Sequence, residues 1–235
     1  STGSTPGLSA AYGAKIVGEG GSAHGNVLEI TGTRGKNLPY AENRIADAYG
    51  AAITNAHNTG VVGGTADGEG NRVTVSGGTV DHVYGGATQG TGAVVHNTAT
   101  ITGGTVTKDV YGGHSTGDGT VASNEVHISR GTVGTATQTA TVYGGAATGS
   151  GDVTGNSVTL TGGTVRGKVI AGAAGTGKVE HNYISLGDES NRNLDAAMLA
   201  AAELRFALPR FGLCFLKWLR TRLPCPGPEQ CQLSQ

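Results

Sequence analysis

The chain repeats the stretch Asn71-Arg72-Val73-Thr74-Val75-Ser76-Gly77-Gly78-Thr79-Val80, which runs on to the corner Val83-Tyr84-Gly85-Gly86. A divergent copy starts at Asn26, and from residue 71 onward the copies start 26 to 32 residues apart, at 71, 97, 124, 156 and 182. Self-similarity at such a period is typical of a solenoid, whose units bury their apolar faces against one another. The repeat therefore predicts a solenoid domain over residues 1–190.

Alternating apolar and polar residues follow each starting asparagine, as in Val73-Thr74-Val75. This period of two predicts a strand with one buried face. A second short strand fits Thr79 to Tyr84, and a third carries a valine three residues before the next asparagine, such as Val94. Three strands per unit, separated by glycine corners, predict an all-β fold, a right-handed parallel β-helix with a coil for each of the six asparagine copies. Helices are disfavoured because 41 of the 43 glycines precede residue 191 and each costs a helix interior about 1 kcal/mol.

The starting asparagines share the parity of the buried apolar residues, so we expect their side chains inside the solenoid. Stacked one coil apart, at about 4.8 Å, each amide can hydrogen-bond to the next, which a buried amide requires. The alternative is that these residues cap turns, because asparagine tolerates turn geometry. Either role is structural. The predicted ladder consists of Asn26, Asn71, Asn97, Asn124, Asn156 and Asn182.

Residues 1–190 carry 10 basic and 14 acidic residues, a balance of −4, without a basic stripe. Nucleic-acid binding is therefore not expected. This region also contains no cysteine, which suits a protein that crosses an oxidising compartment. Cys214, Cys225 and Cys231 lack the spacing of a metal site, and the seven histidines fall at scattered registers. We expect no cofactor and no metal.

The cadence Asn-x-Val-Thr-Ile-Ser-Gly-Gly-Thr-Val, then Val-Tyr-Gly-Gly, then a loop of Gly, Thr and Asp, resembles the repetitive passenger regions of bacterial autotransporters and related surface adhesins. The resemblance covers residues 8–190. It implies export across the inner membrane, and display or release by an outer-membrane β-barrel. The chain departs from the family at its end, where no barrel of alternating ten-residue strands follows. Either the β-barrel translocator lies outside this chain, or this product cannot display itself.

Residues 191–235 have a different composition, with all three phenylalanines and only two of the glycines. Ala196 to Leu208 is rich in Ala and Leu, and we expect a helix there that ends before Pro209. Such a helix would cap the solenoid and cover the edge at Asn182 to Leu186, which would otherwise invite self-association. Two alternatives stay open: a disordered or non-native end, and contact of the basic stretch Arg210 to Leu223 with a membrane surface.

A tyrosine precedes most of the glycine corners, so the tyrosines should stack along one edge of the solenoid. If the rings face outward, they form a ladder suited to a sugar or peptide chain, because tyrosine offers a flat apolar face and a hydroxyl. If they pack against the corner glycines, they belong to the core, and Ile170 in the sixth copy favours this interpretation. The column comprises Tyr12, Tyr49, Tyr84, Tyr111 and Tyr143.

Two further columns raise the question of enzymatic or ice-binding activity. The residues two places before the tyrosines are Asp47, His82, Asp109, Thr141 and Lys168. Asp47 and Asp109, two coils apart, would be separated by about 9.6 Å, close to the carboxyl separation of an inverting glycosidase. Outward threonines such as Thr100 and Thr159 are similar to the arrays of ice-binding β-helices. That face is interrupted by Arg72, Glu125, His127 and Tyr183. Solvated polar side chains explain both columns more simply, so we expect no enzymatic activity.

The sequence thus predicts a structural rod with adhesion as its task, at the bacterial cell surface or secreted. Loops on a rigid scaffold carry function more often than the scaffold does, which makes the longer insertions, Gly32 to Ala48 and Thr135 to Thr141, the natural binding elements. The candidate ligand-binding residues are Arg34, Lys36, Tyr40, Arg44, Tyr49, Tyr84, Tyr111 and Tyr143. The expected partner is a host-surface protein, a matrix protein or a glycan. The alternatives are a polysaccharide-binding or polysaccharide-cleaving β-helix and an ice-binding β-helix.

Overall fold

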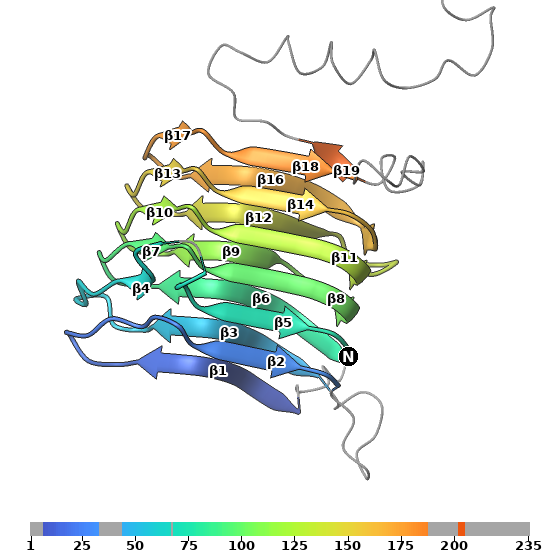
Figure 1. Ribbon diagram of the computed structural model, residues 1–235, viewed down its shortest axis with the longest axis horizontal. Coiled ribbons are helices and arrows are strands. Elements are labelled where there is room, and N and C mark those ends of the chain that lie inside the picture. The colour runs from blue at the N-terminus through green and yellow to red at the C-terminus, as the bar shows by residue number, and fades with distance from the viewer. Residues whose placement is uncertain (1–6, 33–43, 67, 188–201, 205–235) are drawn as a thin grey trace, which may run out of the picture.

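Alternating residues form short strands that stack in parallel from coil to coil, and the result is a parallel β-solenoid (Figure 1). The computed structural model describes residues 7–32, 44–66, 68–187 and 202–204. The chain winds around three faces, which we name the tyrosine face, the threonine face and the short face. All pairings between strands are parallel, and most strands lie against their equivalents in the next coil. The start of β6 also pairs with the end of β8, so the tyrosine and threonine faces belong to one continuous sheet.

The tyrosine face contains β1 (Leu8–Ile16), β3 (Ile45–Ile53), β6 (Thr79–Thr88), β9 (Val110–Ser115), β12 (Ala140–Ala147), β16 (Gly167–Ala174) and β19 (Ala202–Leu204). The threonine face contains β2 (Val27–Ile30), β5 (Arg72–Val75), β8 (Thr98–Val106), β11 (Glu125–Val133), β14 (Ser157–Leu160), β15 (Thr164–Val165) and β18 (Tyr183–Leu186). The short face contains β4 (Val62–Gly63), β7 (Val94–Val95), β10 (Val121–Ala122), β13 (Val153–Thr154) and β17 (Val179–Glu180).

Complete coils are fewer than the six that the asparagine copies predict. Among the described residues, a strand on each of the three faces occurs in the sets β3/β4/β5, β6/β7/β8, β9/β10/β11, β12/β13/β14 and β16/β17/β18. The first coil has β1 and β2 but only an isolated bridge, from Ala23 to Val62, on the short face. The difference arises because short-face strands are two residues long and the divergent first copy does not sustain one.

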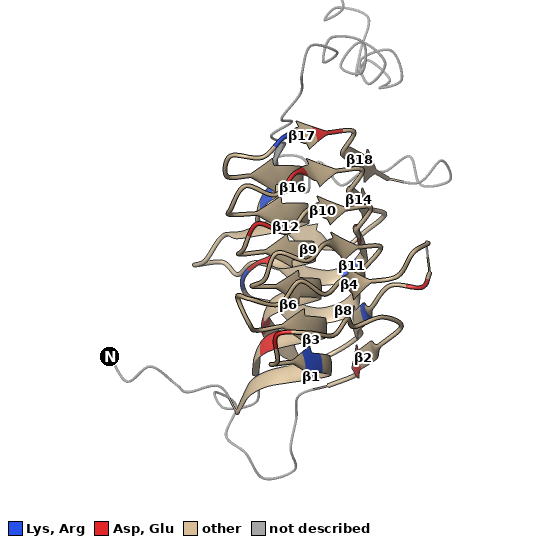
Figure 2. Cartoon of the chain, turned by 90° about the vertical axis from the view of Figure 1, so that its left-hand side faces the viewer, with Lys and Arg blue, Asp and Glu red and all other residues tan. Residues whose placement is uncertain are grey.

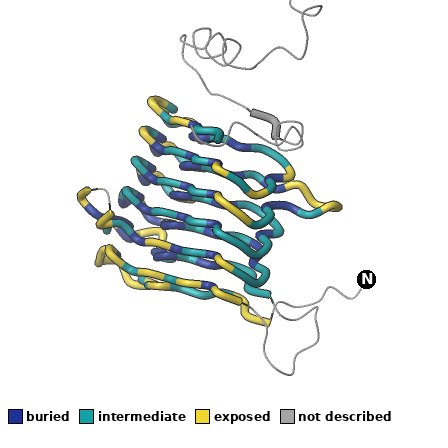
Figure 3. The backbone as a smooth tube through the Cα atoms, turned by 45° about the vertical axis from the view of Figure 1, so that its right-hand side comes forward, coloured by how far each residue is buried: buried dark blue, intermediate teal, exposed yellow. Residues whose placement is uncertain are grey.

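Valine, isoleucine, leucine and alanine fill the interior in stacked columns. Val73, Ala99, Val126, Val158 and Ile184 are successive register partners on the threonine face, and all are buried. Burial of such β-branched side chains on stacked strands supplies the apolar contribution to stability, at about 25 cal/mol per Å² removed from water. Figure 3 shows this core as dark segments inside every coil, whereas the first coil is largely exposed.

The corners explain the Val-Tyr-Gly-Gly motif. A Cβ on Gly86 would lie 2.5 Å from Cγ of Asn97, and one on Gly113 would lie 2.4 Å from Nδ2 of Asn124. The second glycine therefore leaves room for the asparagine side chain of its own coil. Ala51 occupies the same register position as Gly86, so the earlier coil accommodates a methyl group at this corner.

The backbone turns into five of the six ladder asparagines through a left-handed residue; Gly25 and Gly155 are two of these residues. His96, Ser123 and His181 have positive φ angles of 57°, 52° and 56°, and each precedes a ladder asparagine. Outside glycine this conformation is costly, so the turn is imposed by the stacking of the coils.

The C-terminal residues differ from the expected helix where the structure describes them. Ala202–Leu204 form strand β19, which pairs with β16 on the tyrosine face. The strand therefore covers the edge of β16 and not the edge at Asn182 to Leu186. The rest of the expected helix, and the basic stretch Arg210 to Leu223, lie outside the described residues.

Candidate functional site

The six repeat asparagines form one continuous ladder inside the solenoid. Each Nδ2 donates to the Oδ1 of the asparagine one coil further on, over 2.8 Å from Asn26 to Asn71 and 2.9 Å from Asn156 to Asn182. The steps Asn71 to Asn97, Asn97 to Asn124 and Asn124 to Asn156 measure 2.8, 2.9 and 2.9 Å. The four central asparagines are fully buried.

The other polar atoms of these amides also have partners. The Oδ1 of Asn124 accepts a second bond, from the backbone N–H of Asn97 at 3.0 Å. The second hydrogen on Asn97 Nδ2 goes to the Val62 carbonyl of the short face, at 2.9 Å. An unbonded buried amide would cost about 1–3 kcal/mol for each group left without a partner. The ladder therefore ties each coil to the next, and its central amides are not available to a ligand.

Five tyrosines stack on the outside of the tyrosine face. Neighbouring ring centroids lie 4.6 to 5.0 Å apart, and the ring planes are within 8° of parallel. Val83 and Val110, which precede Tyr84 and Tyr111, point inward and are buried, so the tyrosines point outward. All five are half-buried, because each covers its neighbours.

Stacking decides what the tyrosine ladder can offer to a ligand. A sugar that stacks on tyrosine needs a free ring face, and the inner rings of this ladder have both faces covered. At the N-terminal end, Lys15 Nζ lies 5.0 Å from the centroid of Tyr12. Ring edges and hydroxyl groups therefore face solvent. Thus the rings face outward, as the ligand-binding interpretation requires, but their mutual stacking covers the faces that a sugar would use.

The hydroxyls of the three inner tyrosines remain neutral hydrogen-bonding groups. Burial is the largest cause that raises the pKa of Tyr49, Tyr84 and Tyr111 above the ordinary value of 10.0. The Asp47 carboxylate raises the pKa of Tyr49 further, and the Asp109 carboxylate raises that of Tyr111. These three residues thus present hydroxyl donors and acceptors, without a negative charge, at physiological pH.

His114 packs against this ladder. Its ring centroid is 4.5 Å from that of Tyr111 and 5.7 Å from that of Tyr84. Burial, with the neighbouring His82 as the second cause, lowers the pKa of His114 from 6.5 to about 4. The imidazole is therefore neutral near pH 7.

A hollow of about 130 Å³ lies beside His114. His114 is the register partner of Ala87, and Ala87 is the partner of Ala52, so two small residues leave space next to a large one. The other lining residues are Tyr49, Ile53, Thr54, Tyr84, Thr88, Gln89 and Thr116. Tyrosine and glutamine polar groups border an apolar floor there, but the hollow is smaller than ordinary ligand pockets, which measure roughly 300–1,000 Å³.

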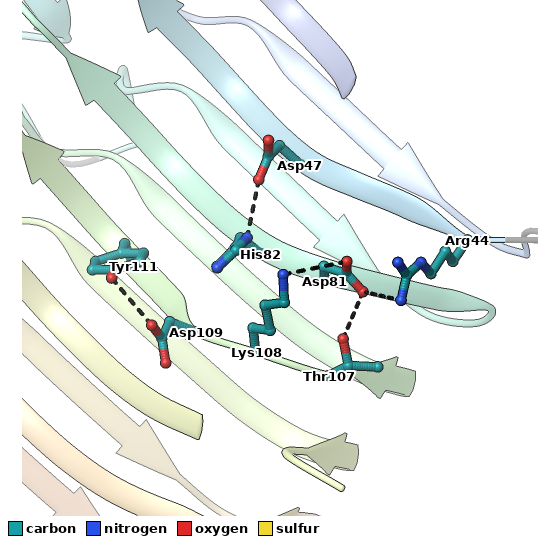
Figure 4. Close-up of polar contacts among 8 residues, drawn as sticks. All are labelled: Arg44, Asp47, Asp81, His82, Thr107, Lys108, Asp109 and Tyr111. Carbon is teal, nitrogen blue, oxygen red and sulfur yellow. Dashed lines mark hydrogen bonds and ion pairs between the residues drawn. The ribbon is translucent and has the colours of Figure 1, made fainter. Parts of the chain in front are cut away.

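The column predicted as a catalytic alternative forms contacts between coils (Figure 4). Asp47 Oδ1 lies 3.1 Å from Nδ1 of His82 in the next coil. The Asp109 carboxylate accepts a hydrogen bond from the backbone N–H of Thr141 at 2.7 Å, and one from the Tyr111 hydroxyl at 3.4 Å. Both carboxylates thus already have partners within the solenoid.

Asp81 forms a buried ionic cluster at the start of the tyrosine face (Figure 4). Its side chain is 3% exposed and accepts a hydrogen bond of 2.7 Å from the Thr107 hydroxyl. An Arg44 guanidinium nitrogen lies 3.4 Å from Oδ1 and Lys108 Nζ lies 3.7 Å from Oδ2. A buried carboxylate requires such partners. The cluster links three successive coils.

This cluster changes the role expected for the insertion Gly32 to Ala48. Arg44, predicted to bind a ligand, is held by Asp81, and Ile45 to Ala48 belong to β3. Arg34, Lys36 and Tyr40 lie outside the described residues. Asp81 itself was not singled out from the sequence, because its partners come from coils of different lengths.

The threonine face carries mixed chemistry. Thr74, Thr100, His127, Thr159 and Ser185 are successive register partners on its outer side. His127 Nε2 lies 2.9 Å from a Glu125 carboxylate oxygen, and both side chains are 43% exposed. This pair of side chains interrupts the flat hydroxyl array that ice binding would need.

Charged groups are sparse on the face shown in Figure 2, where short basic and acidic segments alternate along the rod. Among the described residues, no group of three or more His, Cys, Asp or Glu side chains is arranged to hold a metal ion. The described part of the chain contains no helix that is long and apolar enough to span a membrane.

Comparisons with protein-family models, with curated proteins and with solved structures find no match to this chain.

Proposed function

We propose that this β-solenoid is the structural and adhesive rod of a secreted bacterial surface protein. The observation that carries the proposal is that its asparagine, tyrosine and carboxylate columns bond coil to coil. Side chains used in this way stiffen a rod and leave recognition to loops and to surface groups between the columns. The resemblance of the repeats to autotransporter passenger regions supports export and surface display.

Two parts of the rod suit a host-surface protein, a matrix protein or a glycan. Residues 33–43 contribute Arg34, Lys36 and Tyr40, which offer charge and an aromatic ring. The hollow beside His114 offers the edges of Tyr49 and Tyr84 to a small group of the ligand. Binding at ring edges depends on hydrogen bonds, so hydroxyl-rich or amide-rich ligands fit this surface better than flat apolar ones.

An array of glycans and matrix proteins, probed with the full chain, tests adhesion. We expect binding that is lost when residues 33–43 are replaced by a short Gly-Ser linker. Ile45 to Ala48 must be kept, because they belong to β3. The matched control is Thr159→Ala on the threonine face, which should bind normally. A rod that binds no host or matrix component contradicts adhesion and leaves a purely structural role.

A polysaccharide-cleaving function is the second candidate, favoured by Asp47, His82 and Asp109, which lie in successive coils. We propose that the chain binds without turnover, so incubation with polysaccharides should release no reducing ends. If cleavage occurs and Asp109→Asn abolishes it, the enzymatic alternative holds. Unfolding of the variant must be measured in parallel, because Asp109 also accepts the Thr141 N–H. Thermal hysteresis that disappears in Thr100→Tyr would instead indicate ice binding.

A further inference from the structure

The two ends of the solenoid carry its large exposed apolar residues. Among the described residues, the exposed large hydrophobic side chains are Leu8, Val17 and Val27 at the N-terminal end and Tyr183 at the C-terminal end. Val27 and Tyr183 are 57% and 55% exposed. Figure 3 shows the first coil as an exposed layer. If two rods met end to end, these side chains could be covered, which would remove their apolar surface from water.

Val27 and Tyr183 occupy the same register column. The column runs from Val27 through Arg72, Thr98, Glu125 and Ser157 to Tyr183 on the threonine face. If the N-terminal coil of one copy continued the C-terminal coil of another, Val27 would lie directly over Tyr183. Each would then cover the exposed apolar side chain of the other.

The asparagine ladder ends in complementary groups. No hydrogen bond from the described residues reaches Oδ1 of Asn26, whereas every later ladder oxygen accepts one from the coil before it. At the other end, Nδ2 of Asn182 donates to carbonyls of its own and the preceding coil, and none of the described residues accepts its backbone N–H. A following copy would supply the missing oxygen with its Asn26, in the geometry that each internal step repeats.

The remaining columns also fit across such a junction. Glu29 would lie over Ser185, Lys15 over Ala173 and Tyr12 over Ile170, as the registers of the two end coils require. No pair in these columns brings like charges together. Among the described residues, the outer edges of β1, β2, β17 and β18 pair with no strand.

We propose that copies of this chain associate head to tail, with the first coil of one solenoid stacked on the last coil of the next. The contact is heterologous, so it does not close on itself and produces a growing filament. Strand β19 occupies the edge of β16, which is the place that β1 of an incoming copy would take. The C-terminal segment thus competes with the incoming copy and limits assembly. This inference is independent of the proposed adhesion, because it needs no ligand.

Sedimentation of the full chain over a concentration series tests the assembly. In Glu203→Pro, which removes a backbone donor from β19, we expect the weight-average mass to rise with concentration well above that of the parent chain. Adding Val27→Glu should return the mass to that of the monomer, because it places a carboxylate over the negative face of the Tyr183 ring. The matched control is Thr98→Glu, which puts the same charge in the same column of a central coil and should leave assembly intact. A monomeric Glu203→Pro chain, or equal effects of the two glutamates, overturns the proposal.

The polarity of the contact is tested by cysteine trapping in the Glu203→Pro chain with Cys214, Cys225 and Cys231 changed to serine, so that β19 does not compete with the incoming copy. Neighbouring strands are about 4.8 Å apart, within the Cα separation that a disulfide spans. Mixing Val27→Cys with Tyr183→Cys should give a covalent mixed dimer, and either variant alone should give none. Equal yields of same-variant dimers would contradict the head-to-tail arrangement.

Discussion

Each central ladder asparagine is bonded on both sides along the solenoid axis. Asn124 accepts from the backbone and the side chain of Asn97 and donates to Asn156 and to the Val94 carbonyl. A single residue therefore contributes to three coils. Asn182, at the end of the ladder, is less buried and receives bonds from Asn156 alone.

Asn124→Leu should lower the free energy of unfolding by about 2–4 kcal/mol, because it leaves buried groups of Asn97 and Asn156 without partners. Asn182→Leu provides the matched control and should cost clearly less. Urea denaturation followed by circular dichroism measures both. Equal losses in the two variants would mean that the ladder bonds contribute little beyond side-chain size.

His114 should make the stability of the solenoid depend on pH. Because its folded pKa is lowered to about 4 from 6.5, the unfolded chain binds a proton in this range and the folded chain does not. The contribution of His114 to the free energy of unfolding is fully present above pH 6.5. It decreases by about 1.4 kcal/mol for each pH unit between pH 6.5 and pH 4. We expect His114→Gln to flatten the pH dependence of unfolding in this window. Parallel curves for the two proteins would show that His114 titrates normally when folded.

At the scale of the element, the tyrosine-bearing strands are joined by stacked rings as well as by backbone bonds. Tyr84 has ring neighbours on both sides, 4.6 Å from Tyr49 and 5.0 Å from Tyr111, whereas Tyr143 has one tyrosine neighbour, at 4.9 Å. The stack continues the strand pairing onto the surface. A substitution in the middle of the stack should therefore reduce stability more than one at its end.

Tyr84→Ala should destabilise the rod by about 2–3 kcal/mol, through lost ring contacts at a half-buried site. Tyr84→Phe should be near neutral because it keeps the ring. Tyr143→Ala, at the end of the stack, should cost less than Tyr84→Ala. Thermal unfolding of the three variants measures these differences. A large loss of stability in Tyr84→Phe would mean that the hydroxyl, and not the ring stack, stabilises the rod.

At the scale of the whole molecule, stability should be graded along the rod, because each coil contacts its neighbours and little else. Val83 and Val110 in the central strands β6 and β9 are fully buried, whereas β1 is partly or fully exposed along its length. We expect the slowest amide exchange in the central coils and faster exchange in β1 and β2. Hydrogen exchange read by mass spectrometry measures this gradient. Uniform protection from end to end would indicate a single cooperative unit.

The repeat motif was sufficient to predict the solenoid from the sequence. Alternation in Val73-Thr74-Val75 and the glycine corners act within a few residues, so they predicted parallel strands and inward asparagines without knowledge of the partners. The parity of the asparagines sufficed to place them inside, because side chains in a strand alternate strictly between its two faces.

Contacts between coils were decided by the tertiary structure. The copies start 26 to 32 residues apart, so no fixed spacing in the sequence brings Arg44, Asp81 and Lys108 together. The covered faces of the tyrosine rings, and the hollow beside His114, likewise follow from the exact stacking of coils whose loops differ in length. Strand β19 formed where composition favoured a helix, because an unpaired edge of β16 supplies backbone partners that the local propensity of Ala202–Leu204 does not reflect.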